Sequence, residues 1–303
     1  MSALMSSATV TAVGLTCKAA LNLGFCSVTV NGLPTLVAAL EHSSRNNGKG
    51  VVTVSNHIST LDDPVTWGVL PARYYLHSRM TRWTLGASDI LFTNPVFSTF
   101  FRLGQTIETF RDKGVHQPAV DLAIAKLNQG DWLHLYGEGQ VNPPDTYQRD
   151  QNGVAKLPRF KWGVGRIIME TAKPPVIIPM WLTGFDTLMP EGRPFPYKYI
   201  PRPGAQLSVT FGEPIPASTI EEALKILGPG KASSSAPHHL RKPEGWIENE
   251  LADERHSSVL QKDEILRVRA EVTAILQRAV EALGRSVCGD SLWVKSKSAE
   301  RTD

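Results

Sequence analysis

Short runs of β-branched and aromatic residues alternate with helical segments along the middle of the chain. Strands are predicted at 51–55, 74–77, 106–110, 132–136, 176–182 and 207–211. Helices are predicted near 64–70, 95–103, 117–129 and 162–172. Strands that alternate with helices are typical of α/β folds. We therefore predict an α/β domain over residues 41–227, with a mixed, mostly parallel sheet flanked by helices.

The C-terminal part of the chain has a different character. Residues 228–262 begin with a Gly-, Pro- and Ser-rich stretch that predicts a flexible insertion. Residues 263–284 predict an amphipathic helix packed on the domain, and 285–303 predict a disordered tail. The helix prediction rests on apolar residues that fall on one helical face: Ile265, Val268, Val272, Ile275, Ala279 and Leu283.

The first 40 residues are almost free of charge, since Lys18 is their only charged side chain. At the 20% share of charged residues in the whole chain, that length would carry roughly eight charges. The segment is nevertheless rich in Ser, Thr, Gly and Asn, and it lacks an uninterrupted apolar run long enough to span a bilayer. A buried core helix is one interpretation. We favour a membrane-associated segment over residues 1–40 that lies in one leaflet.

A second apolar stretch, residues 84–101, has Asp89 as its only charged residue and contains several phenylalanines. A core helix would have a similar composition, but such a surface would also enter lipid. Together with the uncharged N-terminus, this stretch favours a monotopic membrane protein with a lipid bilayer as partner.

Overall charge and cysteine usage exclude several classes of protein. The net charge is +3 and no block of Lys and Arg is present, which gives no case for nucleic acid as a partner. The three cysteines, Cys17, Cys26 and Cys288, are scattered, so neither a disulfide framework nor a zinc site is implied. No cofactor and no metal are predicted.

Candidate chemistry begins where the run VVTVS ends and NHISTLDDP follows. His57 is expected at the carboxyl edge of the sheet, where open α/β sheets usually place their sites. Asp63 and Pro64 form a helix-start signature, with Asp63 as N-cap. Asp62 has no such explanation, and it is placed to accept the Nδ1 proton of His57 and leave Nε2 as a base.

This dyad suits deprotonation of a hydroxyl that attacks an acyl carbonyl. A loop histidine with two turn aspartates fits the same sequence. A metal site is a third interpretation, although no second histidine lies near His57 in the sequence.

Three later blocks place polar residues at strand ends or helix starts. Arg111 follows the strand at 106–110 and offers a donor fork for phosphate, or forms a surface ion pair with Asp112. Glu138 and Gly139 follow the strand at 132–136 and form either a ligand-binding turn or a plain hairpin. KWGVGR supplies two cations for phosphate, Lys161 and Arg166.

In this order, the blocks N-H-x4-D, G-x6-R and x-x-E-G, followed by an apolar strand containing proline, resemble the glycerophospholipid acyltransferase family. The resemblance implies that His57 is the base and Asp62 its orienting partner. It also implies that Arg111, Glu138 and Gly139 bind the phosphate of the acyl acceptor. Asn56 and Lys161, which lie within the matching stretches, are further candidates for substrate binding. The third block departs from the family's usual F-P-E-G, since Gly137 replaces the proline.

Four stretches, including NHISTLDDP and KWGVGRIIME, are most similar to the branch of the family that remodels cardiolipin in mitochondria. This implies acyl exchange between phospholipids and lysophospholipids, here cardiolipin and monolysocardiolipin, without acyl-CoA. It also implies a peripheral protein on mitochondrial membranes that faces the intermembrane space. Association with a second copy of the chain stays open.

Three rival interpretations remain at this stage. They are an acyl-CoA-dependent lysophospholipid acyltransferase, a non-catalytic lipid-binding or membrane-shaping protein, and a metal-dependent hydrolase.

Overall fold

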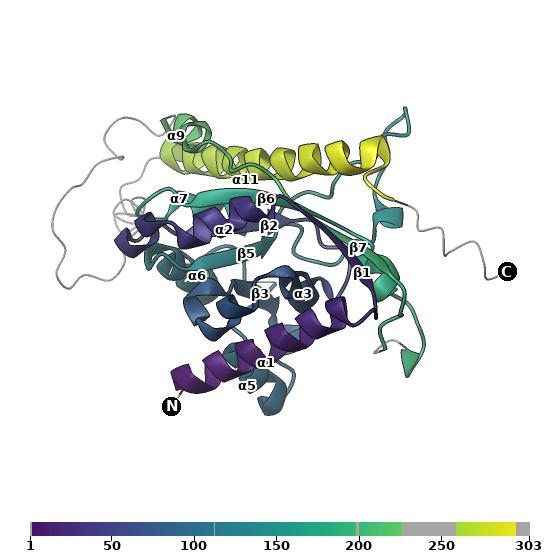
Figure 1. Cartoon of the computed structure of the whole chain (residues 1–303). Helices are drawn as coiled ribbons and strands as arrows, with labels where there is room; N and C mark the ends of the chain where they lie inside the picture. The colour runs from purple at the N-terminus through teal and green to yellow at the C-terminus, as the bar shows by residue number, and fades with distance from the viewer. Residues whose placement is uncertain (1, 112, 198–199, 226–258, 295–303) are drawn as a thin grey trace.

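The computed structural model describes residues 2–111, 113–197, 200–225 and 259–294. Within these residues, seven strands form one sheet in the order β1-β7-β6-β2-β5-β3-β4 (Figure 1). The strands are β1 (Ser27–Asn31), β2 (Val51–Ser55), β3 (Trp83–Ala87), β4 (Thr106–Thr109), β5 (Trp132–Tyr136), β6 (Val176–Thr183) and β7 (Gln206–Phe211). Every neighbouring pair is parallel except β6 and β7. The predicted mixed, mostly parallel sheet is confirmed.

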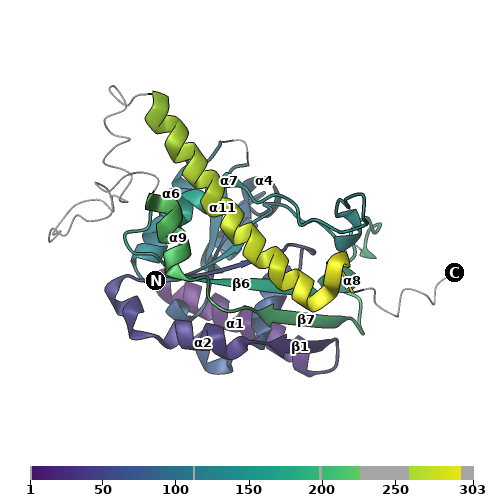
Figure 2. The same cartoon turned by 90° about the horizontal axis from the view of Figure 1, so that it is seen from above.

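Helices cover both faces of the sheet, as Figures 1 and 2 show. One face packs against α6 (Pro118–Asn128), α7 (Trp162–Met169), α9 (Ala217–Leu224) and α11 (Val259–Cys288). The other face packs against α2 (Leu33–Glu41) and the 3-10 turns η2 (Thr66–Val69) and η3 (Ala72–Leu76). The remaining helices are α1 (Ser2–Asn22), α3 (Asp62–Val65), α4 (Ser88–Leu91), α5 (Pro95–Leu103) and α8 (Phe185–Leu188).

The central strand β2 is buried along its whole length, which is why it reads as a continuous apolar run and was predicted. Val52 and Val54 join the core on the α11 face, whereas Val51 joins the core on the α2 face. Thr53 and Ser55 share the face of Val51, and their partners in β5 are His134 and Tyr136. A polar strip therefore runs along this face towards the carboxyl edge of the sheet.

The sequence predictions were wrong at one strand and missed two others. Residues 74–77 were predicted as a strand, but η3 covers Ala72–Leu76, and Tyr74 and Tyr75 both pack inward from it. Successive side chains of a strand point to opposite faces, whereas the neighbouring rings of Tyr74 and Tyr75 are both buried in the same core. β3 was hidden in the apolar stretch 84–101.

β1 was hidden in the uncharged N-terminal 40 residues, although it pairs with β7. Together with α2 it places residues 27–41 in the sheet and its helical layer. The expected membrane-associated segment is therefore reduced to α1 and the turn that follows it. Composition alone did not separate these parts, because β1 and α2 are as poor in charge as α1.

α1 is long and apolar enough, by length and composition, to cross a membrane, with 17% of its Ala3–Asn22 stretch buried. It nevertheless contacts the domain along its length. Ser6 and Lys18 donate side-chain hydrogen bonds to the carbonyls of Leu103 and Leu70, at 2.8 and 2.9 Å. Gly14 lies against the ring of Tyr75, where an added Cβ would come within 2.5 Å of the ring. α1 thus lies along the surface of the domain.

α11 runs four residues beyond each end of the predicted helix 263–284. The first residues assigned to the tail, 285–288, are therefore helical, while 228–258 and 295–303 lie outside the described residues. The helix packs on α7 through close backbone approach, because a Cβ at Gly165 would lie 2.5 Å from the carbonyl oxygen of Arg269. Val268, Val272, Leu276 and Val280 of this helix are fully buried.

Replacing Leu276 with Ala is expected to lower the free energy of unfolding by about 3 kcal/mol, because it removes a fully buried side chain from the α11 interface. Leu266→Ala is the matched control in the same helix, since Leu266 is 41% exposed, and should cost less than about 1 kcal/mol. Urea denaturation measures both. Equal losses in the two variants would contradict the docking of α11 on the core.

Candidate functional site

His57 lies just beyond β2, at the carboxyl edge of the parallel strands, as predicted. Its Nδ1 is 2.8 Å from Oδ2 of Asp62, and its side chain is 19% exposed whereas that of Asp62 is fully buried. Because the ionised carboxylate only accepts hydrogen bonds, the Nδ1 proton of His57 points at Asp62 and Nε2 is left with its lone pair. The imidazole can therefore take a proton at Nε2.

Asp62 is held by the loop that follows β2. Its Oδ2 also accepts the main-chain N–H groups of Ile58 and Ser59, at 2.7 and 3.0 Å. Burial raises the pKa of the Asp62 carboxyl, while the bonds from His57, Ser59 and Ile58 act in the opposite direction because they stabilise the ionised form. The loop thus wraps around one oxygen atom of Asp62 and holds it next to His57.

Glu138 holds the main chain of His57. Its Oε1 accepts the His57 N–H at 2.9 Å, and its Oε2 accepts the side-chain amide of Asn142. The main-chain N–H of Asn142 in turn donates to the carbonyl of His57 at 2.7 Å. The loop after β5 therefore forms hydrogen bonds with both the N–H and the C=O group of His57. Both carboxylate oxygens are used in this way, which gives Glu138 a positioning role. Its predicted contact with substrate stays a prediction.

Burial raises the pKa of Glu138 to about 8, although its two hydrogen bonds, from His57 and Asn142, lower it. A carboxyl with this pKa is largely protonated at neutral pH.

Tyr136 covers one face of the His57 ring. The two rings are stacked with centroids 4.1 Å apart and an angle of 25° between their planes. His134 meets the same tyrosine edge-on, at 4.4 Å. A stacked aromatic ring fixes the plane of the imidazole and stabilises it when it carries a proton.

His134 itself is fully buried and belongs to the polar strip on the sheet. Its two nitrogens lie 2.8 Å from the hydroxyl of Thr53 and 3.4 Å from that of Ser55. Burial lowers the pKa of His134 to about 3, so its ring stays neutral at physiological pH. It supports Tyr136 and does not compete with His57 for a proton.

Asp63 does not act as the helix cap that the sequence predicted. Its carboxylate pairs with the guanidinium of Arg82, with Nε 2.8 Å from Oδ2, and it also accepts the indole N–H of Trp67 at 3.1 Å. Burial favours a higher pKa for Asp63, but Arg82 holds the pKa below its ordinary value. Arg82 also donates to the carbonyl of Gly104, at 3.0 Å. The side chain of Asp63 pairs with Arg82 and does not cap the helix. The prediction was wrong because the sequence alone did not show that a cation lies so close.

Asn56 joins β2 to β6. Its amide donates to the carbonyl of Leu182 at 3.0 Å and accepts the Leu182 N–H at 2.8 Å, and its side chain is fully buried. This geometry gives Asn56 a positioning role next to His57. Its predicted contact with substrate stays a prediction.

Lys161 and Gly139, two of the predicted substrate-binding residues, lie next to each other. Gly139 has a φ of 69°, which favours glycine, and a Cβ there would lie 2.8 Å from Cγ of Lys161. Lys161 is exposed, so its ammonium group stays accessible at the carboxyl edge. Arg166, in contrast, is buried and paired with Glu170 and Asp121. It is not available to a phosphate.

Arg111 lies beyond the carboxyl end of β4, which is three strands away from β2 in the sheet. Strand spacing places it roughly 14 Å from His57 along the same edge. The residue forms an exposed ion pair with Asp89, at 3.5 Å. Asp112, the partner that the sequence suggested, lies outside the described residues. Its predicted role towards phosphate stays a prediction.

Sequence reasoning missed Arg82, Asn142 and Tyr136. Asn142 and Tyr136 both stand in the stretch YGEGQVN that drew attention to Glu138. Arg82 precedes β3, the strand that was not predicted. Among the residues that the structure describes, no three His, Cys, Asp or Glu side chains lie close enough to share a metal ion.

The family model described as Acyltransferase matches residues 33–183, which contain all of the site residues above. Tafazzin of Drosophila melanogaster is 41% identical over 57% of this chain and 42% of the fly protein. The protein named taffazin in Dictyostelium discoideum is 36% identical over 70% of both chains. N-acylphosphatidylethanolamine synthase of Arabidopsis thaliana is 38% identical over 67% of this chain and 68% of the plant protein.

The chain thus matches less than half of the length of the fly relative. Among solved structures, the 1-acyl-sn-glycerophosphate acyltransferase PlsC of Thermotoga maritima shares the fold, with a TM-score of 0.50 and 19% identity. That similarity covers 91% of this chain and 79% of PlsC. Identity of 36% over most of the Dictyostelium protein, with the matching family model, shows that this chain belongs to the tafazzin family of acyltransferases.

Proposed function

We propose that the chain is a CoA-independent transacylase that exchanges acyl chains between phospholipids and lysophospholipids, with cardiolipin and monolysocardiolipin as substrates. The observation that carries the proposal is the contact between His57 and Asp62, at 2.8 Å, on the carboxyl edge of an acyltransferase fold. The similarity of the sequence blocks to the cardiolipin-remodelling branch supports the choice of substrates and the absence of acyl-CoA.

In the proposed reaction, Nε2 of His57 takes the proton from the lysolipid hydroxyl as its oxygen attacks an acyl ester carbonyl of the donor lipid. Asp62 stabilises the imidazolium that forms. The tetrahedral intermediate collapses with cleavage of the ester bond to the donor glycerol oxygen. His57 returns the proton to this departing oxygen, so the same groups serve the reverse reaction.

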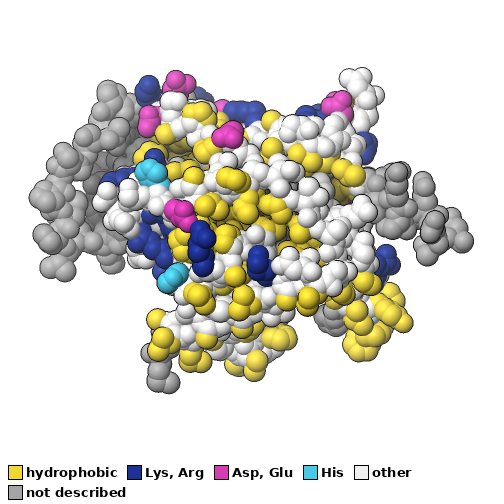
Figure 3. Space-filling view, in the orientation of Figure 1, with side chains coloured by type: hydrophobic (Ala, Val, Ile, Leu, Met, Phe, Trp, Pro, Cys, Tyr) yellow, Lys and Arg dark blue, Asp and Glu magenta, His cyan; other side chains and the backbone are white. Residues whose placement is uncertain are grey.

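The face formed by α1 and α5 is proposed to meet the bilayer that holds both substrates. Hydrophobic side chains gather along the lower edge of the molecule, where α1 and α5 lie (Figure 3). Among the large hydrophobic residues of α1 and α5, Leu4 and Val96 have the highest exposed fractions, at 79% and 75%. Because α1 is docked along its length, we propose a monotopic attachment, on mitochondrial membranes and facing the intermembrane space, as the family resemblance implies.

A second candidate function is acyl transfer to the amine of phosphatidylethanolamine. The similarity to the Arabidopsis protein named N-acylphosphatidylethanolamine synthase favours it. The dyad would serve this chemistry equally, because an ammonium group must also lose a proton before it attacks an ester.

Mass spectrometry of cardiolipin mixed with a lysophospholipid and purified protein, without CoA, tests the activity. Wild type is expected to produce exchanged species, and His57→Ala is expected to lose at least about a hundredfold in rate because the base is gone. Adding phosphatidylethanolamine reveals N-acylated product if the second function holds. Rapid acyl transfer from acyl-CoA to lysolipid in the absence of a phospholipid donor would contradict the transacylase.

Asp62→Asn is expected to lower turnover at least about a hundredfold, since the amide no longer stabilises the imidazolium. Asp63→Asn leaves Arg82 without its carboxylate. It should lower the free energy of unfolding by about 2 kcal/mol, because the guanidinium of Arg82 is largely buried and would lose its charged partner. Initial rates and thermal unfolding separate the two effects. Comparable loss of rate in a folded Asp63→Asn variant would place both aspartates in the chemistry.

Glu138 makes stability depend on pH. Because burial raises its pKa to about 8 in the folded chain, its contribution to stability is present below its ordinary pKa of 4.5 and declines as the pH rises through 8. The midpoint of thermal unfolding should therefore fall between pH 6 and pH 9 more steeply in wild type than in Glu138→Gln, which does not titrate. Parallel profiles would show that this carboxyl does not titrate with the assigned pKa.

A further inference from the structure

The segment of residues 189–203, MPEGRPFPYKYIPRP, connects α8 to β7 and contains five prolines. We call it the proline segment. It begins shortly after β6, whose residue Leu182 is bonded to Asn56, the residue before His57. The segment therefore leaves the sheet at the same edge as the candidate catalytic dyad.

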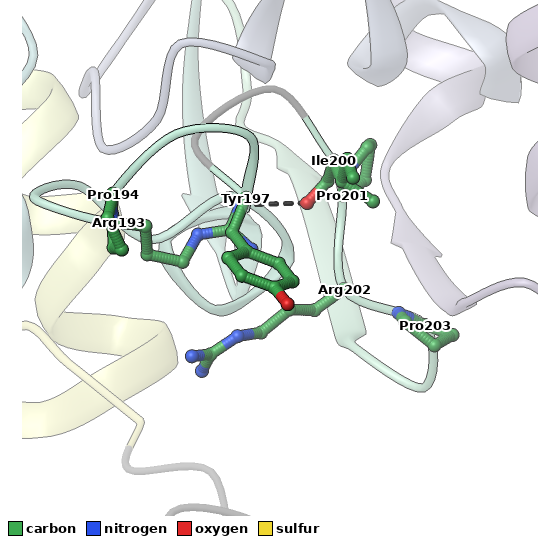
Figure 4. A pocket seen from close by; sticks show the side chains of 7 residues that line it. All are labelled: Arg193, Pro194, Tyr197, Ile200, Pro201, Arg202 and Pro203. Carbon is green, nitrogen blue, oxygen red and sulfur yellow. Dashed lines mark hydrogen bonds between the residues drawn. The ribbon is translucent and has the colours of Figure 1, made fainter.

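The proline segment carries large apolar side chains on its surface. Phe195 is 77% exposed, Tyr197 59% and Ile200 51%. A hydrogen bond within the segment holds its chain in place. The guanidinium of Arg193 donates to the carbonyl of Ile200 at 2.8 Å and so links the first and the last part of the segment (Figure 4). The main chain of Arg202 is fixed as well, through its N–H to the carbonyl of Leu188 at 2.7 Å.

Charge in the segment is mostly positive. Its sequence has three basic residues, Arg193, Lys198 and Arg202, against the single acidic residue Glu191. Arg202 is exposed and lines a pocket of about 380 Å³ together with Tyr197 and Ile200 (Figure 4). Aromatic rings, apolar side chains and arginines in one short segment are the groups that sit at the boundary of lipid head groups and acyl chains.

The segment continues the apolar face of α1. The N–H of Gly204 donates to the carbonyl of Phe25 at 2.7 Å, and the N–H of Ser27 donates to the carbonyl of Ala205 at 3.0 Å. These bonds tie the base of the segment to the turn after α1, where Leu23 is 83% exposed. Figure 3 shows a second group of hydrophobic side chains at the lower right, where the chain between α8 and β7 lies in Figure 1.

We propose that the proline segment is a second bilayer contact, selective for anionic phospholipids. Phe195, Tyr197 and Ile200 enter the boundary between head groups and acyl chains, and Arg202 meets lipid phosphates. The proposal rests on the proposed membrane attachment through α1 and adds a contact beside the catalytic edge. Two contacts, one along α1 and one at this edge, fix the tilt of the domain on the bilayer, so that an acyl ester at the lipid surface reaches His57.

Co-sedimentation of the full chain with vesicles tests the proposal. The vesicles are phosphatidylcholine alone, or phosphatidylcholine mixed with phosphatidylglycerol. The double variant F195S/I200S is expected to lose roughly tenfold in partition on both kinds of vesicle, because two apolar side chains no longer enter lipid. Arg202→Glu is expected to lose roughly tenfold on the anionic vesicles and to bind neutral vesicles like wild type.

The matched control is L122S/L266S, which replaces two residues of similar exposure on α6 and α11, at 43% and 41%. It should bind like wild type, and unchanged thermal unfolding of all variants shows that each is folded. Equal binding of F195S/I200S and wild type overturns the proposal, as does equal loss of Arg202→Glu on neutral and anionic vesicles. A dimer of the wild type that the F195S/I200S substitutions dissociate also overturns it, because the segment would then contact a second copy.

A further variant, L4S/L15S on α1, separates this proposal from the attachment on which it rests. Loss of vesicle binding in that variant, with none in F195S/I200S, removes the role of the proline segment and leaves the attachment through α1 standing. Wild-type binding by both variants overturns both.

Discussion

The two hydrogen bonds that Glu138 and Asn142, in the loop after β5, make to the main chain of His57 are the constraint on which the rest of the site depends. They exist because β2 and β5 are parallel neighbours, so that Ser55 lies opposite Tyr136 and the two loops leave the sheet side by side. One loop carries His57 and Asp62, and the other carries Glu138 and Asn142 and follows directly after Tyr136, whose ring stacks on His57. A shift of register by one residue would separate all of these groups.

Three carboxyl groups lie within this small volume, and each is stabilised differently. Asp62 is surrounded by N–H donors, Asp63 is paired with Arg82, and Glu138 has a pKa that burial raises. Like charges this close would otherwise raise one another's pKa values and weaken the fold. The differences leave Asp62 as the acceptor of the Nδ1 proton of His57, which is the arrangement that the proposed reaction requires.

The parts of the fold that the sequence predicted are those governed by burial. β2, β5 and β6 are covered on both faces and appear as apolar runs, and His57 with Asp62 follows from a spacing of five residues. β1 and β3 were missed because each has only five residues and lies within or beside a longer stretch that is nearly free of charge. The role of Glu138 was not predictable, since its partner is a main-chain N–H group. Arg82 pairs with a residue 19 positions away, and no local pattern records such a contact.

The pairing of β1 with β7 has a consequence for the synthesis of the chain. Asn31 and Thr210 are partners although they are 179 residues apart, so this edge of the sheet cannot close until the chain has left the ribosome almost as far as α9. Contacts of such long range slow folding, because a large loop must close before they form. Until then β1 is an unpaired strand beside the apolar helix α1, and both are surfaces on which a chaperone or a lipid bilayer can act first.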